Sequence, residues 1–373
     1  MALEVAEIFQ RYGEHYCQKY AGRMPARHRQ VMRAIQRCRT EALGGQTYCC
    51  PDCKHVLYSY HSCRNRHCPK CQNENGQQWL EKQQHALLPV PYFLLTFTLP
   101  DKISRLARSH QKLFYNLLFR ISAAATQQLA ADPRFIGGKI GMMGVLHTWG
   151  RTMVYHPHVH YLVPAGGLAQ DGATWLPARK NFLLPVKALS RLFRGKFHQA
   201  LRNETIYSQI PARLWKQEWV VHCEPVGSGL NALKYLAPYI FRVAISNNRL
   251  IKLENDLVSF RYRHTQTRKE KCCTLPAEEF IRRFLQHVLP KNFVKVRYYG
   301  LFSPSLRKKL LAIRQYLDSI SCLPVQTQII VEHSKPEPSQ GMSSLSRLPI
   351  RCPVCGGIMQ LNLPIISSDY DPP

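Results

Sequence analysis

The segment from Tyr155 to Val163 constrains the fold of this chain most, because it alternates histidine with apolar residues. Successive side chains of a β-strand point to opposite faces, so His158 and His160 are expected on one face. Two neighbouring imidazoles can hold a divalent metal ion, which polarises a phosphodiester oxygen and orients the phosphorus for in-line attack. The pattern therefore predicts a strand that carries part of a metal site.

A third metal ligand is expected from the preceding strand. Residues Lys139 to Trp149 form another apolar and β-branched run, and a short polar turn connects it to the histidine strand. A hairpin centred on this turn places His147 directly across from His158, which makes His147 the preferred third ligand. Reserve ligands are His156, His222 and Glu224. The alternative interpretation is that these histidines only pack in the core with satisfied hydrogen bonds.

Two tyrosines spaced four residues apart, Tyr235 and Tyr239, are candidate nucleophiles, because this spacing brings both to one side of a helix. A phenol has a pKa of about 10, so attack on phosphate requires a positive field, which Lys234, Arg242 and the metal provide. Pro238 removes an amide donor between them and predicts a kink. The other interpretation of the pair is aromatic packing on an amphipathic helix.

The charge of the chain indicates a polyanionic partner. Lysine and arginine total 51 against 23 acidic residues, which gives a formal net charge of +28 spread along the 373 residues. Nucleic acid fits this balance, because each neutralised phosphate releases counterions. The hydrophobic content of 45% predicts a folded protein of two or three domains. No signal peptide or membrane-spanning run is visible, so we expect no membrane partner and a cytosolic location.

Two Cys-x-x-Cys pairs predict a zinc site near the amino terminus. Fourteen residues separate Cys50-Pro-Asp-Cys53 from Cys68-Pro-Lys-Cys71, a spacing typical of two knuckles that surround Zn²⁺ with four thiolates. A reducing compartment favours metal binding over disulfides. Ligands that could replace one of these are Cys49, His61, Cys63 and His67. Between the knuckles Arg64 and Arg66 add positive charge, so we expect this module to contact DNA. Cys352 and Cys355 form half of a second ribbon, with Cys322 or His333 as remote candidates to complete it.

Periodicity and turn residues predict an α+β fold. Expected helices lie in residues 2–39 (two, separated at Pro25), 76–88, 103–129, 186–202 and 230–242. Expected strands lie in residues 91–99, 139–149, 158–163, 218–222, 257–263 and 293–299. We divide the chain into a helical and zinc-binding DNA-binding region (1–85), a nuclease domain (90–322) and a Pro/Ser-rich tail (323–373). The tail is expected to be poorly ordered except for its Cys-x-x-Cys segment, Cys352 to Gly357.

The chain resembles the insertion sequence 91 family of rolling-circle transposases, within the HUH nucleases. The resemblance covers most of the chain and is carried by several motifs in order: Ser62 to Gln72, His147 to Gly150, His156 to His160, Tyr235 to Tyr239 and Arg242 to Asn247. It implies a zinc ribbon-like module and a ferredoxin-like antiparallel sheet bearing the histidines, with Mg²⁺ or Mn²⁺ as metal. It also implies that one tyrosine cleaves single-stranded DNA to a 5′-phosphotyrosine while the second acts at another end.

Three other functions share parts of this pattern. A plasmid replication initiator or relaxase would use the same chemistry on different DNA. A zinc-stapled DNA-binding protein would use the histidines and tyrosines only for packing. A metal-dependent hydrolase would activate water, but such sites usually recruit carboxylates, and no Asp or Glu cluster lies near His158 in the sequence. No phosphate-binding Gly-x-x-x-x-Gly-Lys-Ser/Thr loop occurs, so helicase activity is expected from host proteins.

Overall fold

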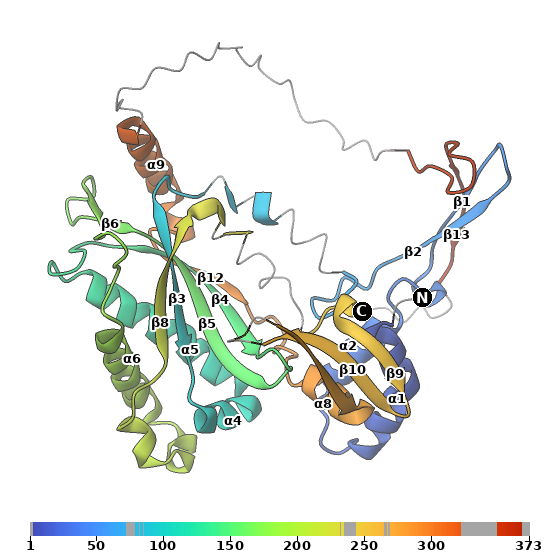
Figure 1. Ribbon diagram of the computed structural model, residues 1–373, viewed down its shortest axis with the longest axis horizontal. Coiled ribbons are helices and arrows are strands. Elements are labelled where there is room, and N and C mark those ends of the chain that lie inside the picture. Colours follow the sequence, from blue (N-terminus) through green and yellow to red (C-terminus); the bar gives the residue numbers. More distant parts are fainter. Residues whose placement is uncertain are drawn as a thin grey trace, which may run out of the picture. The chain divides into compact units, whose positions relative to one another are not determined.

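The structure is a computed structural model that describes residues 3–71, 79–81, 83–84, 86–231, 233–234, 244–264, 267, 269–321 and 349–367. The chain divides into two compact units (Figure 1): one comprises residues 1–36 and 65–321, and the other comprises residues 37–64 and 322–373. Both contain antiparallel sheets, and the first also carries helices. The predicted α+β class is therefore confirmed. In the described stretches, no helix is both long and apolar enough to cross a membrane.

The first unit is built on a five-stranded antiparallel sheet. Its strand order is β12 (Val296–Gly300), β4 (Gly141–Trp149), β5 (Tyr155–Pro164), β3 (Pro91–Thr98) and β8 (Val221–Ser228). The histidine strand β5 is central and pairs with β4 and β3. Because both of its edges are hydrogen-bonded, its side chains are fixed to one face or the other along its whole length.

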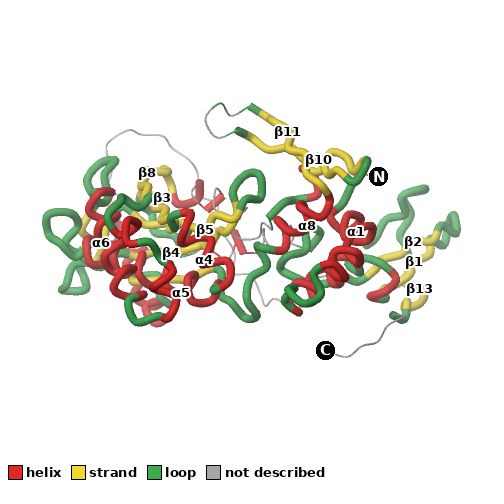
Figure 2. Tube along the Cα trace, turned by 90° about the horizontal axis from the view of Figure 1, so that it is seen from below, coloured by secondary structure: helices red, strands yellow, loops and turns green. Residues whose placement is uncertain are grey.

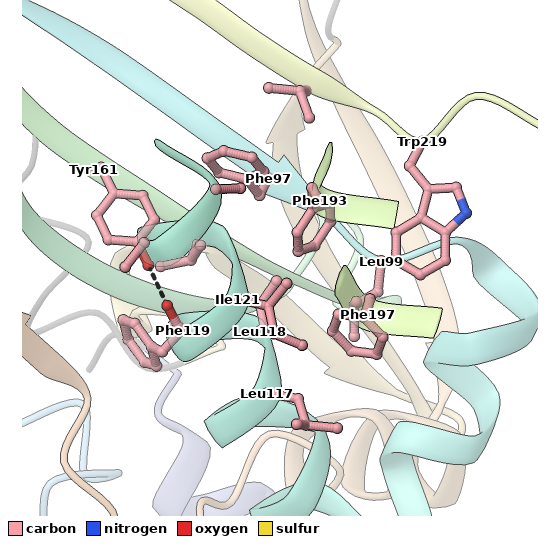
Figure 3. Close-up of a cluster of buried hydrophobic side chains, with 14 of the residues drawn as sticks. Phe97, Leu99, Leu117, Leu118, Phe119, Ile121, Tyr161, Phe193, Phe197 and Trp219 are labelled. Atoms are coloured by element: carbon pink, nitrogen blue, oxygen red, sulfur yellow. Dashed lines mark hydrogen bonds between the residues drawn. The ribbon is translucent and has the colours of Figure 1, made fainter. Parts of the chain in front are cut away.

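One face of this sheet is covered by helices α4 (Asp101–Ser109), α5 (Gln111–Ala130) and α6 (Val186–Leu201). Figure 2 shows these helices together on one side of the strands. Apolar residues of β3 and β5 alternate toward them, and Phe97, Tyr161, Phe193, Phe197 and Trp219 form an aromatic cluster (Figure 3). The period-two alternation of the strand sequences therefore fills this core and leaves the second face for other groups.

The structure corrects several predicted boundaries. The single helix predicted at 103–129 is two helices, because His110 (φ −123°, ψ 44°) leaves the helical region and ends α4. Strand β8 begins at Val221 instead of residue 218, and β12 begins at Val296 instead of residue 293. The predicted helices 76–88 and 230–242 fall partly outside the described residues, although residues 79–81, 83–84, 229–231 and 233–234 are helical.

The opposite face of the sheet has its own smaller apolar cluster. Tyr92 and Leu94 of β3 pack there with Met143 of β4, Leu162 of β5 and Leu233. Farther along β4 and β5, alternate positions on this face carry the histidines. This face thus carries apolar contacts at one end and imidazoles at the other.

Helices α1 (Val5–Lys19) and α2 (Ala26–Gln36) also belong to the first unit and are separated near Pro25 as predicted. Phe9 of α1 packs edge-on against Phe284 of α8 (Ala277–Leu285), with ring centroids 5.2 Å apart. Helix α8 also packs on the sheet of β9 (Leu250–Glu254), β10 (Leu257–Arg263) and β11 (Glu270–Pro276). The other elements among the described residues of this unit are β6 (Gly166–Leu168), β7 (Trp175–Pro177), α9 (Arg307–Ser321) and the short 3₁₀ turns Thr205–Gln209, Ala212–Trp215, Asn247–Arg249 and Pro304–Leu306.

The second unit is a three-stranded antiparallel sheet in the order β13 (Gln360–Ile365), β1 (Gly45–Cys49) and β2 (Val56–Tyr60), with a 3₁₀ turn at Glu41–Leu43. The expectation of a poorly ordered tail outside Cys352 to Gly357 is wrong for residues 349–351 and 358–367, which are described and include β13. This strand is short and contains Pro364, which suits only an edge position and weakens its sequence signal. Residues 322–348 and 368–373 lie outside the described part.

Phe193 tests the aromatic core. Its ring centroid lies 5.0 Å from that of Phe97 and 5.3 Å from that of Trp219, and the side chain is fully buried. Phe193→Ala should lower the free energy of unfolding by about 3–5 kcal/mol, because it removes buried contacts and leaves a cavity. Urea denaturation provides the measurement. Phe182→Ala, at a 36% exposed position, is the matched control and should cost less than about 1 kcal/mol; equal losses would contradict the packing described.

Candidate metal centre and catalytic site

Three histidines converge on the second face of the five-stranded sheet. The β4–β5 ladder pairs His147 directly with His158, as the hairpin register predicted, and His160 follows two positions later on the same face. One ligand nitrogen from each of the three residues lies within 4.8 Å of the others. The ring centroids are 4.7–5.2 Å apart, and all three pairs meet edge to face. The arrangement brings three donor nitrogens around one point.

Hydrogen bonds at Nδ1 orient two of these rings. Nδ1 of His158 lies 2.6 Å from the carbonyl oxygen of His156, and because a carbonyl only accepts, this nitrogen carries the proton. Nδ1 of His160 lies 2.8 Å from the hydroxyl oxygen of Thr96 on β3. An Nδ1 that donates puts the ring lone pair on Nε2, the arrangement found in histidines that bind metals.

Burial keeps the imidazoles of His158 and His160 neutral. Desolvation lowers the pKa of His158 to about 4; the nearby His156 ring lowers this pKa too, and the His156 carbonyl partly opposes both. Desolvation also holds the pKa of His160 well below its ordinary value, and the neighbouring His158 lowers it further. A neutral imidazole is the form that coordinates a metal ion, so no proton has to be displaced near pH 7. The donor set therefore fits a divalent cation.

An aromatic and basic wall borders the histidines. The Trp149 ring stacks on the His147 ring at a centroid distance of 5.3 Å, and Nζ of Lys295 lies 4.9 Å from the centroid of Trp149. Burial, and after it the nearby Arg66, lower the pKa of Lys295 to about 7. Stacked indole and ammonium groups suit the bases and phosphates of a nucleic acid. The three imidazoles thus lie beside an indole ring and a basic side chain.

The end of α8 and the residues after it hold the β4–β5 turn. Nε2 of the buried His287 donates to the carbonyl of Met153 at 3.1 Å, and its Nδ1 lies 3.2 Å from the hydroxyl oxygen of Thr148. Gln286 donates to the same Met153 carbonyl at 2.8 Å, and Arg283 donates to the Thr152 carbonyl at 3.1 Å. These residues fix the hairpin that bears the histidines. Arg283, Gln286 and His287 were not predicted to support the site, because contacts between residues more than a hundred positions apart leave no local pattern in the sequence.

The predicted nucleophiles Tyr235 and Tyr239, together with Arg242, lie outside the described residues. The chain leading to them is described: residues 229–231 and 233–234 are helical, and the fully buried Leu233 packs on the sheet face that carries the histidines. Lys234 is exposed.

The reserve ligands lie near the cluster without belonging to it. His222 is the cross-strand partner of Thr96, and Glu224 is the partner of Leu94, so both share the histidine face but are exposed. The His156 ring centroid is 5.2 Å from that of His158. Among the described residues, the group of mutually close ligand atoms contains three histidines and no carboxylate.

The cysteines form two groups of four, each with sulfur atoms within 4.8 Å of one another. One contains Cys38, Cys63, Cys68 and Cys71, and the other contains Cys50, Cys53, Cys352 and Cys355. The structure therefore brings together the two cysteines of each predicted knuckle, but it does not join Cys50 and Cys53 to Cys68 and Cys71. The prediction rested on knuckles that are near in sequence, and Cys38 was not predicted because it stands outside any Cys-x-x-Cys pair.

The residues around the knuckles have varied partners. Arg64 is exposed, whereas the Arg66 guanidinium donates to the carbonyls of Pro290 and Phe293 at 2.7 and 2.6 Å. The reserve ligand His67 is buried; its Nε2 accepts from the Leu289 amide at 3.1 Å. Arg66 and His67 thus hold the segment 289–293.

Comparison with known proteins identifies the family. Residues 141–309 match a family model described as "Putative transposase", and residues 8–99 match one described as "Transposase zinc-binding domain". "Putative transposase y4qJ" of Sinorhizobium fredii is 40% identical over 99% of this chain and 97% of its own length. The transposase for insertion sequence element IS801 of Pseudomonas savastanoi pv. phaseolicola is 28% identical over 86% of this chain and 80% of its own length. The chain belongs to the insertion sequence 91 family of transposases. No solved structure matches it.

Membership in this transposase family agrees with the charge of the chain and with its grouped cysteines. A transposase acts on DNA, which agrees with the +28 charge, and the matched zinc-binding region contains six of the eight grouped cysteines, so Zn²⁺ is a cofactor of this part of the chain. The residues His147, His158 and His160 all fall within the transposase match at 141–309.

The His287 contact makes a prediction about pH. Burial lowers the pKa of His287 to about 4, whereas the same residue in the unfolded chain titrates near 6.5. Between these values only the unfolded chain takes up the proton, so His287 destabilises the fold as the pH falls from about 6.5 to about 4, by up to about 1.4 kcal/mol per pH unit. The free energy of unfolding, measured in urea at pH 7, 6 and 5, should fall less steeply in His287→Gln than in wild type. Parallel curves would contradict the buried neutral imidazole.

Proposed function

We propose that this transposase cleaves and rejoins single-stranded DNA through a 5′-phosphotyrosine on Tyr235 or Tyr239, with Mg²⁺ or Mn²⁺ held by His147, His158 and His160. The observation that carries the proposal is the convergence of the three imidazoles, two of them with Nδ1 held by hydrogen bonds. The ion, when bound, would polarise a non-bridging oxygen of the scissile phosphate and orient the phosphorus for in-line attack.

The histidine face gives the phosphate its position. His158 and His160 come from the central strand β5 and His147 from β4, so the donors sit on rigid, fully paired backbone. Trp149 and Lys295 border the same group and offer the strand being cut an indole ring and an amine, which carries a charge on about half of the molecules near pH 7 because burial lowers its pKa to about 7. Leu233 anchors the segment just before Tyr235 on this face. The position of Leu233 supports the proposal that a tyrosine hydroxyl lies within reach of the phosphate.

The reaction exchanges a phosphodiester bond in the DNA for a phosphotyrosine bond, so the bond energy is conserved. The tyrosine oxygen forms a bond to phosphorus as the bond from phosphorus to the 3′ oxygen breaks, and the departing 3′ hydroxyl takes a proton while the phenol loses one. A phenol with a pKa of about 10 loses its proton more easily in a positive field, and Lys234 adds one adjacent to Tyr235. Attack by a 3′ hydroxyl on the phosphotyrosine reverses the step and joins a new strand. No nucleotide hydrolysis is needed, and host replication or helicase proteins would expose the single strand.

Hydrolysis by water is the second chemistry that the metal site permits. Hydrolytic sites usually add carboxylates that bind the ion or accept the proton of water. The histidine group contains none among the described residues, and the nearby Glu224 is exposed. This donor set favours a protein nucleophile over activated water.

The nucleophile test uses 3′-labelled single-stranded oligonucleotides drawn from the DNA that flanks the coding sequence of this chain. With Mn²⁺, wild type should release a shortened strand and retain the labelled fragment in a covalent adduct on a denaturing gel. Tyr235→Phe with Tyr239→Phe should abolish the adduct while DNA binding persists, and His158→Ala should slow cleavage by about 100-fold or more. The controls are Tyr262→Phe, on β10, and His110→Ala, at an exposed position.

Two outcomes would overturn the proposal. If the double tyrosine variant cuts as fast as wild type and leaves a free 5′ phosphate, water is the nucleophile. If wild type binds these oligonucleotides but neither cuts nor links to any of them with Mg²⁺ or Mn²⁺, the histidine face has a binding role only.

A second test addresses the orientation of His160. Thr96→Val keeps the shape of the side chain but removes the hydroxyl group beside Nδ1 of His160. Loss of such an orienting contact should weaken Mn²⁺ binding by about 10- to 100-fold, measured by titration calorimetry. Thr98→Val is the matched control, because Thr98 pairs with His158, whose Nδ1 is held by a backbone carbonyl instead. Equal affinities in the two variants would show that Thr96 has no role in orienting His160.

A further inference from the structure

We propose that Cys50, Cys53, Cys352 and Cys355 bind one Zn²⁺ ion and so make the carboxy-terminal Cys-x-x-Cys pair a part of the amino-terminal zinc-binding region. The matched zinc-binding region ends at residue 99, so it does not include Cys352 or Cys355. Two of the close sulfur pairs come from residues 299 and 305 positions apart in the chain. The proposed site is independent of the strand-transfer chemistry of the histidine face.

The sulfur geometry fits a tetrahedral zinc ion. The Sγ atoms of Cys50 and Cys355 are 3.4 Å apart, those of Cys53 and Cys352 are 3.5 Å apart, and all four lie within 4.8 Å of one another. Four thiolates at about 2.3 Å from Zn²⁺ stand about 3.8 Å from each other in a tetrahedron. A disulfide would need sulfur atoms at about 2.05 Å. The separations are those of four thiolates around an ion.

The two knuckles have the same backbone fold. The amide of Cys50 donates to the carbonyl of His55, and the amide of Lys54 donates back to the carbonyl of Cys50 at 3.0 Å. In the other knuckle the Cys352 amide donates to the Gly357 carbonyl, and the Gly356 amide donates to the Cys352 carbonyl at 2.9 Å.

The turn conformation at the fifth position of each knuckle also agrees. Lys54 has φ 59° and Gly356 has φ 78°, so both occupy the left-handed region. For a lysine this conformation is uncommon and needs a reason. A tight turn that aims two cysteines of one Cys-x-x-Cys pair at the same point provides it, and two such turns facing each other complete a set of four ligands.

The sheet of the second unit holds the knuckles together. Strand β13, which follows the Cys352 knuckle, pairs antiparallel with β1, which precedes the Cys50 knuckle, and Gln360 is the partner of Cys49. Thr47 Oγ1 donates to the Leu363 carbonyl at 2.8 Å and accepts from the Leu363 amide at 2.9 Å. The pairing thus places both cysteine turns at one end of the sheet.

The apolar core behind this site is small. Its buried members are Cys50, Cys352 and Met359, with Tyr48, Leu57 and Ile350 partly buried against them. A cluster of this size cannot alone offset the conformational entropy of ordering a three-stranded sheet. A structural zinc ion contributes folding free energy directly, which gives this sheet the staple that its core lacks.

The test measures zinc bound to the full-length protein, purified under reducing conditions. The double variant Cys352→Ser with Cys355→Ser should carry one zinc equivalent fewer per chain than wild type, measured by inductively coupled plasma mass spectrometry. Its matched control is Cys272→Ser with Cys273→Ser, two cysteines of β11 that lie outside both four-cysteine groups. The control should retain the wild-type zinc content. Neither readout requires DNA cleavage, so failure here and failure of the proposed function are distinguishable.

A second measurement does not depend on how the variant folds. In the wild-type protein, alkylation followed by peptide mass spectrometry should show Cys50, Cys53, Cys352 and Cys355 protected together, and exposed together after a zinc chelator is added. Equal zinc in wild type and the Cys352/Cys355 variant would overturn the proposal. So would alkylation of Cys352 and Cys355 at the same rate with and without chelator.

Discussion

The pairing of β4 with β5 is the contact on which the site depends. It sets His147 opposite His158 and leaves His160 on the same face, so one register fixes all three donors. A slip of one residue would turn one strand's histidines toward the helical core. The register is enforced from both sides: aromatic residues of β3 and β5 fill the core, and Gln286 and His287 hold the turn at Met153.

Where a contact is local in sequence, the residues predicted the geometry well. The alternation of His158 and His160 in an apolar run fixed their common face, and the turn between the strands fixed the partner at His147. Pro25 marked the division between two helices. The break at His110 was missed because no glycine or proline marks it in the sequence. It is visible only in the backbone angles of His110. Contacts made by His287 lie far away in sequence and have no periodic signature.

For the cysteines, too, the sequence predicted the local turns but not which turns lie together in the fold. Each Cys-x-x-Cys pair was recognised because a knuckle is a local turn. The structure groups the knuckles differently from the predicted set of four, because that grouping depends on tertiary pairing. The β13 strand adds to the edge of β1 and brings Cys352 and Cys355 to Cys50 and Cys53. Within the described residues, the sheet of the second unit therefore joins segments from near both ends of the chain.

The proposed chemistry requires that the imidazoles of His147, His158 and His160 bind one metal ion. Electron spin echo modulation of Mn²⁺ bound to the protein counts the nitrogen ligands directly. We expect couplings from three histidine nitrogens in wild type and from two in His147→Ala, with no change in His110→Ala. A spectrum of Mn²⁺ surrounded only by oxygen ligands, identical in all three proteins, would contradict the account.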